Sequence, residues 1–166
     1  MRHGIVVGIA FWVFVMLLCD EAAKAQWQSV GLRVGGGVST SAEVAMQWQA
    51  GPDRVEGTVG WLKEGHHVDQ TLAALWQWYG VARDGFEWYA GIGVHAAWRQ
   101  WESGYGDPSL VPALAAQVGL QYDFDRVPLS ITIDMRPRFE MPAARLMLGE
   151  VAVGLRLRIE HFVVFD

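Results

Sequence analysis

FEWYAGIGVHAAWRQW, the stretch from Phe86 to Trp101, is the part of the sequence that decides the fold. Every second residue from Phe86 to Trp98 is apolar, and the residues between them include charges, glycines, a tyrosine and a histidine. Successive side chains of a β-strand point to opposite faces, so this alternation predicts a strand with one apolar and one polar face. The stretch is longer than a soluble strand of about 5–6 residues and long enough for a tilted membrane strand of about 9–11.

The composition of the chain agrees with a wall of such strands. Apolar residues make up 52%, yet no later segment has the about 18 consecutive apolar residues that a spanning helix requires. Nine tryptophans and nineteen glycines suit membrane interfaces and a crowded barrel interior. A net charge of −5 gives no electrostatic reason to expect a nucleic-acid partner.

Residues 1–25 have the pattern of a cleavable signal peptide. A short basic start precedes an apolar run over residues 5–18, and an A-x-A cleavage signal ends at Ala25. Cleavage there leaves residues 26–166 as one barrel domain, without the only cysteine, Cys19, and therefore without a disulfide or thiol metal site. An uncleaved anchor and a lipoprotein signal are the alternatives for this segment.

Seven further segments repeat the alternation. They are residues 27–40, 42–50, 54–64, 70–82, 113–124 and 129–136, and a last strand that begins with Met147 pointing outward. Short links imply antiparallel neighbours, and an even number of strands lets the first pair with the last. The sequence therefore predicts an all-β, eight-stranded antiparallel up-and-down transmembrane β-barrel.

The polar face of these strands carries acidic and basic residues in equal number. They are Arg33, Glu43, Arg54, Glu56, Glu87, Arg99, Asp123, Asp134, Arg136, Glu150, Arg156 and Arg158. Buried charges must be paired, and an eight-stranded barrel has room inside for side chains and little else. We therefore expect a lumen charge network that plugs the barrel; a narrow solute channel is the alternative.

Aromatic residues lie toward the ends of the apolar face, where a bilayer has its interfaces. The expected aromatic girdle consists of Trp48, Trp61, Trp76, Trp78, Trp88, Trp98, Tyr122 and Phe124.

No catalytic, cofactor-binding or metal residue can be assigned from the sequence, and no catalytic motif occurs. His95 on the inner face is expected to be a packed histidine, with a catalytic base as the alternative. His66, His67 and Asp69 form a weak metal-site pattern in a polar loop. We expect any extracellular partner to bind the longer loops, residues 65–69, 102–112 and 137–145.

The chain resembles the small eight-stranded outer-membrane barrels of Gram-negative bacteria, the OmpA-like and OmpX-like class, and within it a family of uncharacterised barrels. The segments that carry the resemblance are Thr71–Trp76, Phe86–His95, Gly119–Phe124, Val127–Asp134 and Pro137. The resemblance implies a cell outer-membrane location, contact with outer-membrane lipids and insertion by the barrel-insertion machinery. It implies no cofactor and supplies no catalytic residue.

Two other functions fit the same alternation. A membrane-embedded lipid-modifying enzyme would use loop histidines and serines for acyl chemistry. A soluble, lipocalin-like carrier would turn the apolar face inward around an apolar ligand. The position of the apolar face therefore separates the carrier from a membrane barrel.

Overall fold

The computed structural model describes residues 27–159 apart from residues 38, 103–105, 142 and 149, so the expected signal peptide lies outside the described residues. Ten strands form one sheet within this part of the chain. They are β1 (Trp27–Gly36), β2 (Thr40–Ala50), β3 (Asp53–Glu64), β4 (His67–Arg83), β5 (Phe86–Trp101), β6 (Ser109–Asp123), β7 (Leu129–Met135), β8 (Arg138–Glu140), β9 (Arg145–Met147) and β10 (Val151–Arg158). No helix among the described residues is long and apolar enough to cross a bilayer.

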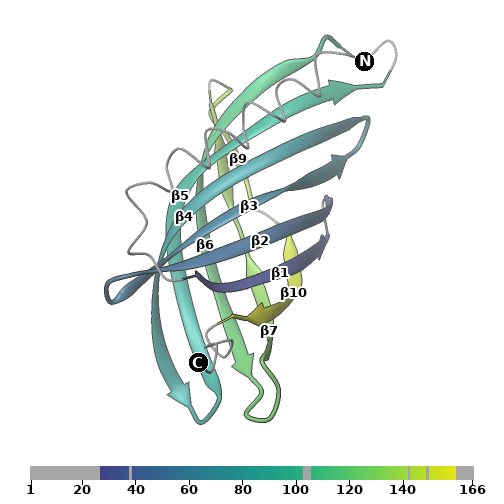
Figure 1. Ribbon diagram of the computed structural model, residues 1–166. Helices are drawn as coiled ribbons and strands as arrows, with labels where there is room; N and C mark the ends of the chain where they lie inside the picture. The colour runs from purple at the N-terminus through teal and green to yellow at the C-terminus, as the bar shows by residue number, and fades with distance from the viewer. Residues whose placement is uncertain (1–26, 38, 103–105, 142, 149, 160–166) are drawn as a thin grey trace.

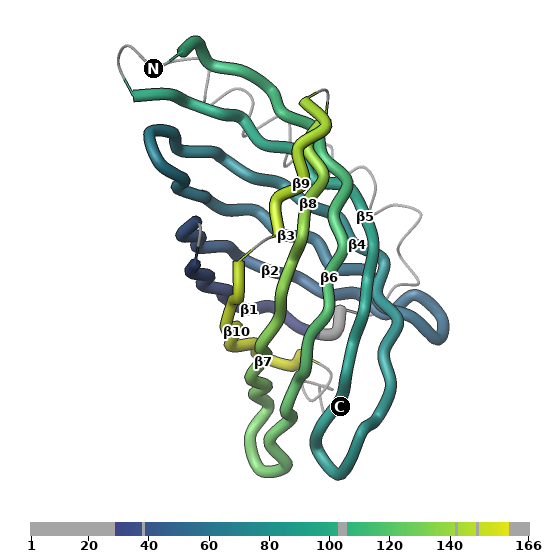
Figure 2. The backbone as a smooth tube through the Cα atoms, turned by 180° about the vertical axis from the view of Figure 1, so that it is seen from behind, coloured from purple at the N-terminus to yellow at the C-terminus, as the bar shows by residue number. Residues whose placement is uncertain are grey.

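The sheet closes on itself as an antiparallel barrel with eight strand positions in its wall, which we call staves (Figures 1 and 2). Two of the staves each consist of two consecutive strands. Strands β1 to β6 each pair with the next strand in the chain, which gives the up-and-down order. The seventh stave is β7 followed by β8, which both pair with β6, and the eighth is β9 followed by β10. Pairing of β10 with β1 closes the wall. The predicted all-β, eight-stranded antiparallel barrel is thus confirmed.

Tight turns connect several staves and give the barrel two distinct ends. Gly51 and Gly85 have φ values of 65° and 76°, a conformation that glycine adopts without a steric penalty. Both lie in turns at the same end, which we call the base and which holds the turns after β2, β4 and β6. The opposite end, which we call the rim, holds the turns after β1, β3 and β5.

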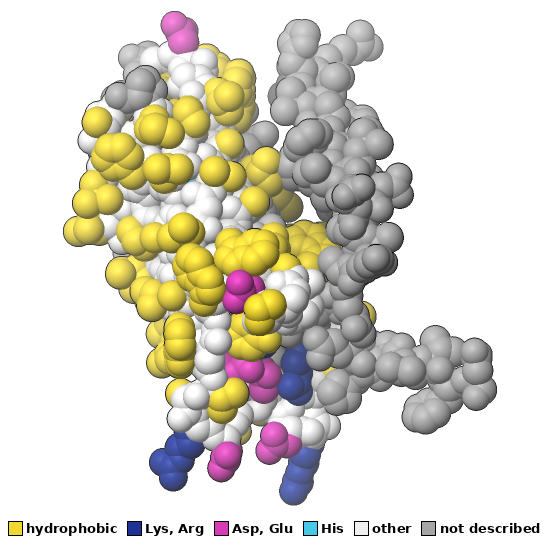
Figure 3. All heavy atoms as spheres, turned by 90° about the vertical axis from the view of Figure 1, so that its left-hand side faces the viewer, with side chains coloured by type: hydrophobic (Ala, Val, Ile, Leu, Met, Phe, Trp, Pro, Cys, Tyr) yellow, Lys and Arg dark blue, Asp and Glu magenta, His cyan; other side chains and the backbone are white. Residues whose placement is uncertain are grey.

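The two faces of the wall differ in polarity along every long strand. In β5 the outward positions from Phe86 to Trp98 are exposed or half-buried, whereas Tyr89, His95 and Arg99 point inward and are buried. Large apolar side chains cover the outer surface seen in Figure 3, and many of the charged side chains in that view gather at the lower end. The period of two in the sequence therefore separates an apolar outside from a polar lumen.

Three loops are shorter than the sequence indicated, because pairing continues beyond the polar residues that had marked loops. The expected loop 65–69 is wrong from His67 onward, since His67 and Asp69 belong to β4. The expected loop 102–112 ends where β6 begins at Ser109. The expected loop 137–145 contains β8 and the first residue of β9.

The expected outward orientation of Met147 is also wrong. Met147 is buried, whereas Leu148 is exposed. The eighth stave is interrupted between β9 and β10, and the alternation resumes with Glu150 inside and Val151 outside. One extra residue at an interruption moves every following side chain to the opposite face of the sheet. The alternation in a single sequence does not show where such an extra residue lies.

Candidate functional site

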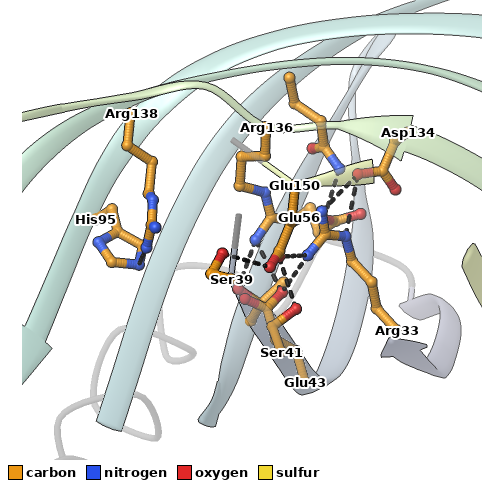
Figure 4. Close-up of polar contacts among 12 residues, drawn as sticks. Arg33, Ser39, Ser41, Glu43, Glu56, His95, Asp134, Arg136, Arg138 and Glu150 are labelled. Carbon is orange, nitrogen blue, oxygen red and sulfur yellow. Dashed lines mark hydrogen bonds and ion pairs between the residues drawn. The ribbon is translucent and has the colours of Figure 1, made fainter. Parts of the chain in front are cut away.

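The centre of the lumen holds a guanidinium group that contacts three carboxylates (Figure 4). Arg33 in β1 is 1% exposed. Its Nη1 lies 3.1 Å from Glu43 Oε2 and 2.8 Å from Glu150 Oε1, and its Nη2 lies 2.8 Å from Asp134 Oδ1. These partners come from β2, from the segment between β9 and β10, and from β7. Arg33 thus connects four parts of the wall across the barrel interior.

A second carboxylate centre adjoins the first. Glu56 in β3 is fully buried. Arg136, in the link between β7 and β8, binds Glu56 Oε1 at 2.8 Å and Glu43 Oε2 at 2.9 Å. Arg156 in β10 forms a close ion pair with Glu56 Oε2. Because Glu43 contacts both Arg33 and Arg136, the two centres form one connected network.

Neutral side chains also donate hydrogen bonds to the carboxylates of this network. Gln47 and Gln117 donate toward Glu56, and Gln77 links these two amides. Tyr89 donates to Asp134 Oδ2 at 3.0 Å. Buried carboxylates are tolerated only when their lone pairs are satisfied in this way. The carboxylates of the network therefore have partners, while one guanidinium nitrogen, Arg136 Nε, is buried without one.

Smaller ion-pair groups lie at the two ends of the lumen. At the rim, Arg99 Nη2 lies 2.9 Å from Asp69 Oδ2 and 3.0 Å from Glu140 Oε1. At the base, Arg54 pairs with Glu87 at 2.8 Å and Arg158 pairs with Asp123 at 3.2 Å. A polar cavity of about 160 Å³ lies between these two ion pairs at the base. It is lined by Ser29, Gln47, Arg54, Glu87, Gln121, Asp123, Ser130 and Arg158.

The structure places all twelve residues of the expected charge network on the inner face. Glu87, Asp123 and Arg158 are half-buried at the base, and the other nine are buried. Asp69, Arg138 and Glu140 also belong to the lumen charges but were not expected there, because their segments read as loops in the sequence. All three lie in phase with the alternation of the adjoining strand, and extension of that alternation through the assumed loops would have found them.

The expected aromatic girdle lies on the outer face of the barrel. Its exposed members are Trp61, Trp76, Trp78, Trp88 and Trp98, and its half-buried members are Trp48, Tyr122 and Phe124. Trp76 donates from Nε1 to Asp53 Oδ2 at 2.9 Å, beside the turn after β2. The rings of Tyr122 and Phe124 lie 5.1 Å apart at the base. Tryptophans with one apolar side and one hydrogen-bonding group suit the boundary between lipid and water.

The three histidines named in the sequence do not converge. His66 is exposed, with Nδ1 3.2 Å from Glu102 Oε2. His67 points inward, with Nε2 3.8 Å from Asp69 Oδ2. His95 lies deeper, with Nε2 3.5 Å from Arg138 Nη1. Within residues 27–159, leaving aside the undescribed positions, no group of three His, Cys, Asp or Glu side chains is arranged to hold a metal ion.

Comparisons with known proteins identify the fold. No protein-family model and no curated protein sequence matches the chain. The structure is similar to the crystal structure of Neisserial surface protein A (NspA), with a TM-score of 0.59 and 11% sequence identity over 80% of this chain and 94% of that one. It is also similar to a de novo designed transmembrane β-barrel, with a TM-score of 0.51 and 14% identity over 80% of this chain and 95% of the design. The chain therefore has the closed, eight-stranded barrel fold that is found in outer-membrane proteins.

Proposed function

We propose that this protein is an outer-membrane β-barrel with a sealed lumen that acts as a structural or interaction protein through its rim. The observation that carries the proposal is the polarity of the wall. Ile92 at the middle of β5 is 58% exposed, while Glu56 on the opposite face of the wall is 0% exposed. A soluble protein has the reverse arrangement, with charges outside and aliphatic side chains inside.

The outer surface favours acyl chains as its surroundings. Among the described residues, large aliphatic and aromatic side chains are exposed on seven of the eight staves, for example Leu32, Val118 and Val153. On β2 the outward Val44, Met46 and Trp48 are half-buried. A continuous apolar surface of this kind far exceeds the patches that soluble monomers expose, and each buried apolar Å² contributes about 25 cal/mol. The same polarity argues against the lipocalin-like carrier, because that function needs the apolar face inside.

The lumen network supports the proposal that the barrel does not conduct. Side chains from several staves meet at Arg33, Glu43 and Glu56, so a solute would have to break buried ion pairs to pass. In a planar bilayer, the purified protein should give no stable porin-like conductance. A steady conductance that responds to substitution of Glu56 would favour the narrow channel instead.

Fractionation of producing cells tests the location. The protein should be recovered in the outer membrane after loss of residues 1–25, and it should migrate differently in SDS gels before and after heating. N-terminal sequencing of the membrane form should begin at Gln26. Recovery as a detergent-free soluble monomer would contradict the proposal.

Spin labels test the orientation of the wall independently. Labels at Ile92, Val118 and Val153 should be relaxed strongly by lipid-dissolved oxygen. Labels at Ser29 and Ser130, inner positions that line the cavity at the base, should respond weakly. The opposite order would place the apolar face inside.

We propose that a partner binds the exposed loop residues at the rim. Turn residues Gly65 and His66, together with residues 106–108, are exposed. Replacement of residues 103–107 by a Gly-Ser loop of equal length should leave heat-modifiable migration unchanged and remove any interaction that depends on the rim. Loss of the folded band in this variant would show that the loop has a structural role instead.

Enzymatic lipid modification is the second candidate function. Only His66 among the three histidines is exposed at the rim, and its described partner is Glu102. A His66→Ala variant that lost lipid turnover, while keeping the folded gel band, would favour this candidate.

A further inference from the structure

The cavity at the base of the lumen has charged residues of both signs in its lining. Arg54 in β3 pairs with Glu87 in β5, and Arg158 in β10 pairs with Asp123 in β6. These four are the charged residues that line the cavity, and the other lining residues are serines and glutamines. Each charge already has a partner of the opposite sign, so the cavity has no net charge that would attract an ion.

The lining residues keep hydrogen-bonding capacity that the protein itself does not use. Arg54 Nε, Arg158 Nε and Ser130 Oγ are buried without a partner in the described part of the chain. The two nitrogen atoms are donors, and the serine hydroxyl can both donate and accept. The carboxylates of Glu87 and Asp123 can accept more hydrogen bonds than the ion pairs supply, because each has about four acceptor sites. A suitable occupant of the cavity therefore donates and accepts hydrogen bonds.

The two ends of the cavity differ in their contact with solvent. Glu87 and Asp123 are half-buried at the base, whereas Gln47 and Gln121 are only 3% and 5% exposed. Both amides hydrogen-bond to residues of the central network, as in the contact of Gln47 with Glu56. The cavity is therefore accessible from the base and is closed toward the middle of the barrel by the buried network.

We infer that this cavity is a water-filled vestibule that admits small, neutral, hydrogen-bonding solutes from the base and disfavours ions. Its volume of about 160 Å³ holds about five water molecules at about 30 Å³ each, or one molecule of about six non-hydrogen atoms. An added ion would lack a counter-charge in a largely buried place, which is strongly unfavourable. Compounds with hydroxyl or amide groups fit, because they donate and accept hydrogen bonds. The inference rests on the barrel interior alone and does not depend on the membrane location.

Thiol labelling of single-cysteine variants tests the inference. Cys19, the only cysteine of the chain, is replaced by serine in every variant. Folded protein in a zwitterionic detergent is treated with the neutral hydroxyethyl methanethiosulfonate and with its cationic ammonioethyl and anionic sulfonatoethyl analogues. Each rate at Ser130→Cys is divided by the rate of the same reagent at the exposed Ser109→Cys. The neutral reagent should modify Ser130→Cys, and both charged reagents should be slower by at least about tenfold, because their charge is not compensated in the cavity.

Thr132→Cys is the matched control for the inner end of the vestibule. Thr132 is on the inner face of β7, like Ser130, but is one inward position further along the strand, is 1% exposed and does not line the cavity. Thr132→Cys should therefore stay unmodified by all three reagents.

Two further measurements keep the inference falsifiable if Ser130→Cys fails to fold. Ser29→Cys in β1 replaces it, because Ser29 also lines the cavity. Crystals of the unaltered protein should show ordered water in the cavity, within hydrogen-bonding distance of Ser130 Oγ. The inference is overturned by a dry cavity in these crystals, by a vestibule cysteine that the neutral reagent does not modify, by charged reagents that match the neutral one, or by Thr132→Cys reacting as fast as Ser130→Cys.

Discussion

Glu56 is the residue on which two arginines converge, so its charge determines whether both are compensated. It has no exposed surface and pairs with Arg136 and Arg156. Removal of one partner from a buried ion pair costs about 3–5 kcal/mol, far more than the pair contributes over an apolar replacement. The network therefore adds little net stability, but each of its members is needed once the others are present.

We expect Glu56→Gln to lower the free energy of unfolding by about 3–5 kcal/mol, because it leaves two buried guanidinium groups with too little negative charge. Urea titration in lipid vesicles, followed by tryptophan fluorescence, measures the change. The matched control is Glu64→Gln, because Glu64 pairs with Arg145, whose side chain is more than half exposed. An exposed pair contributes at most about 1 kcal/mol. Equal losses in the two variants would show that the lumen is hydrated rather than tightly packed.

Gly119 in β6 is required by the ring of Tyr89. A Cβ atom at Gly119 would lie 2.6 Å from Tyr89 Oη and 2.7 Å from Asp134 Cβ. Gly119→Ala should therefore displace the tyrosine from Asp134 and cost about 1–3 kcal/mol, as other overpacked cores do. Gly36→Ala is the control, because a Cβ there has no neighbour within 4 Å. The same urea titration compares them, and an unchanged Gly119→Ala midpoint would contradict the observed packing.

At the scale of the element, the length and the two faces of β5 fit the proposed membrane location. Its sixteen residues run from the base to the rim, with Trp88 and Trp98 toward its two ends and Ile92 between them. A strand of this length has a middle that lies deep in hydrocarbon and ends that lie near water. The cost of a charge on its outer face should therefore depend on position along the strand axis.

Ile92→Arg should lower the free energy of unfolding in vesicles by about 2–4 kcal/mol, the cost of a charge at the bilayer midplane. Leu110→Arg should cost at most about 1 kcal/mol, because Leu110 also faces outward but is the second residue of β6, at its rim end. Both side chains are well exposed, at 58% and 62%, so a soluble barrel would tolerate both changes equally. Equal tolerance in vesicle titrations would contradict the membrane location.

At the scale of the whole molecule, closure depends on strands from the two ends of the described chain. Val34 in β1 faces Val153 in β10 across the antiparallel pair. Without this pairing both strands would have open edges, with unpaired backbone groups that are very unfavourable in lipid.

A disulfide can report this closure. We expect the double variant Val34→Cys/Val153→Cys to crosslink under mild oxidation, because directly opposed residues in antiparallel strands have Cβ atoms about 4.5–5.5 Å apart. Mass spectrometry of the unfolded, oxidised protein detects the bond. The control pair Val34→Cys/Ile92→Cys joins β1 and β5, which are not neighbours in the sheet, and should remain reduced. Crosslinking of the control alone would contradict the strand order.

The sequence by itself determined the fold class, the two faces of the wall and the limits of β5. These features follow from the alternation of neighbouring residues, which is local and can be seen in one sequence. The same alternation located Arg33, Glu56 and Arg156, each of which the structure places on the inner face.

Only the tertiary structure decided which charges meet and where the loops end. Arg33 binds Asp134, and Arg156 binds Glu56, across about a hundred residues of chain. Which residues form ion pairs depends on the relative shift and tilt of non-adjacent strands. This shift and tilt leave no pattern among neighbouring residues of the sequence. The pairing with neighbouring strands likewise placed Asp69 and Arg138 inside the barrel, because a strand continues as long as its neighbours supply hydrogen-bonding partners, even where the side chains are polar.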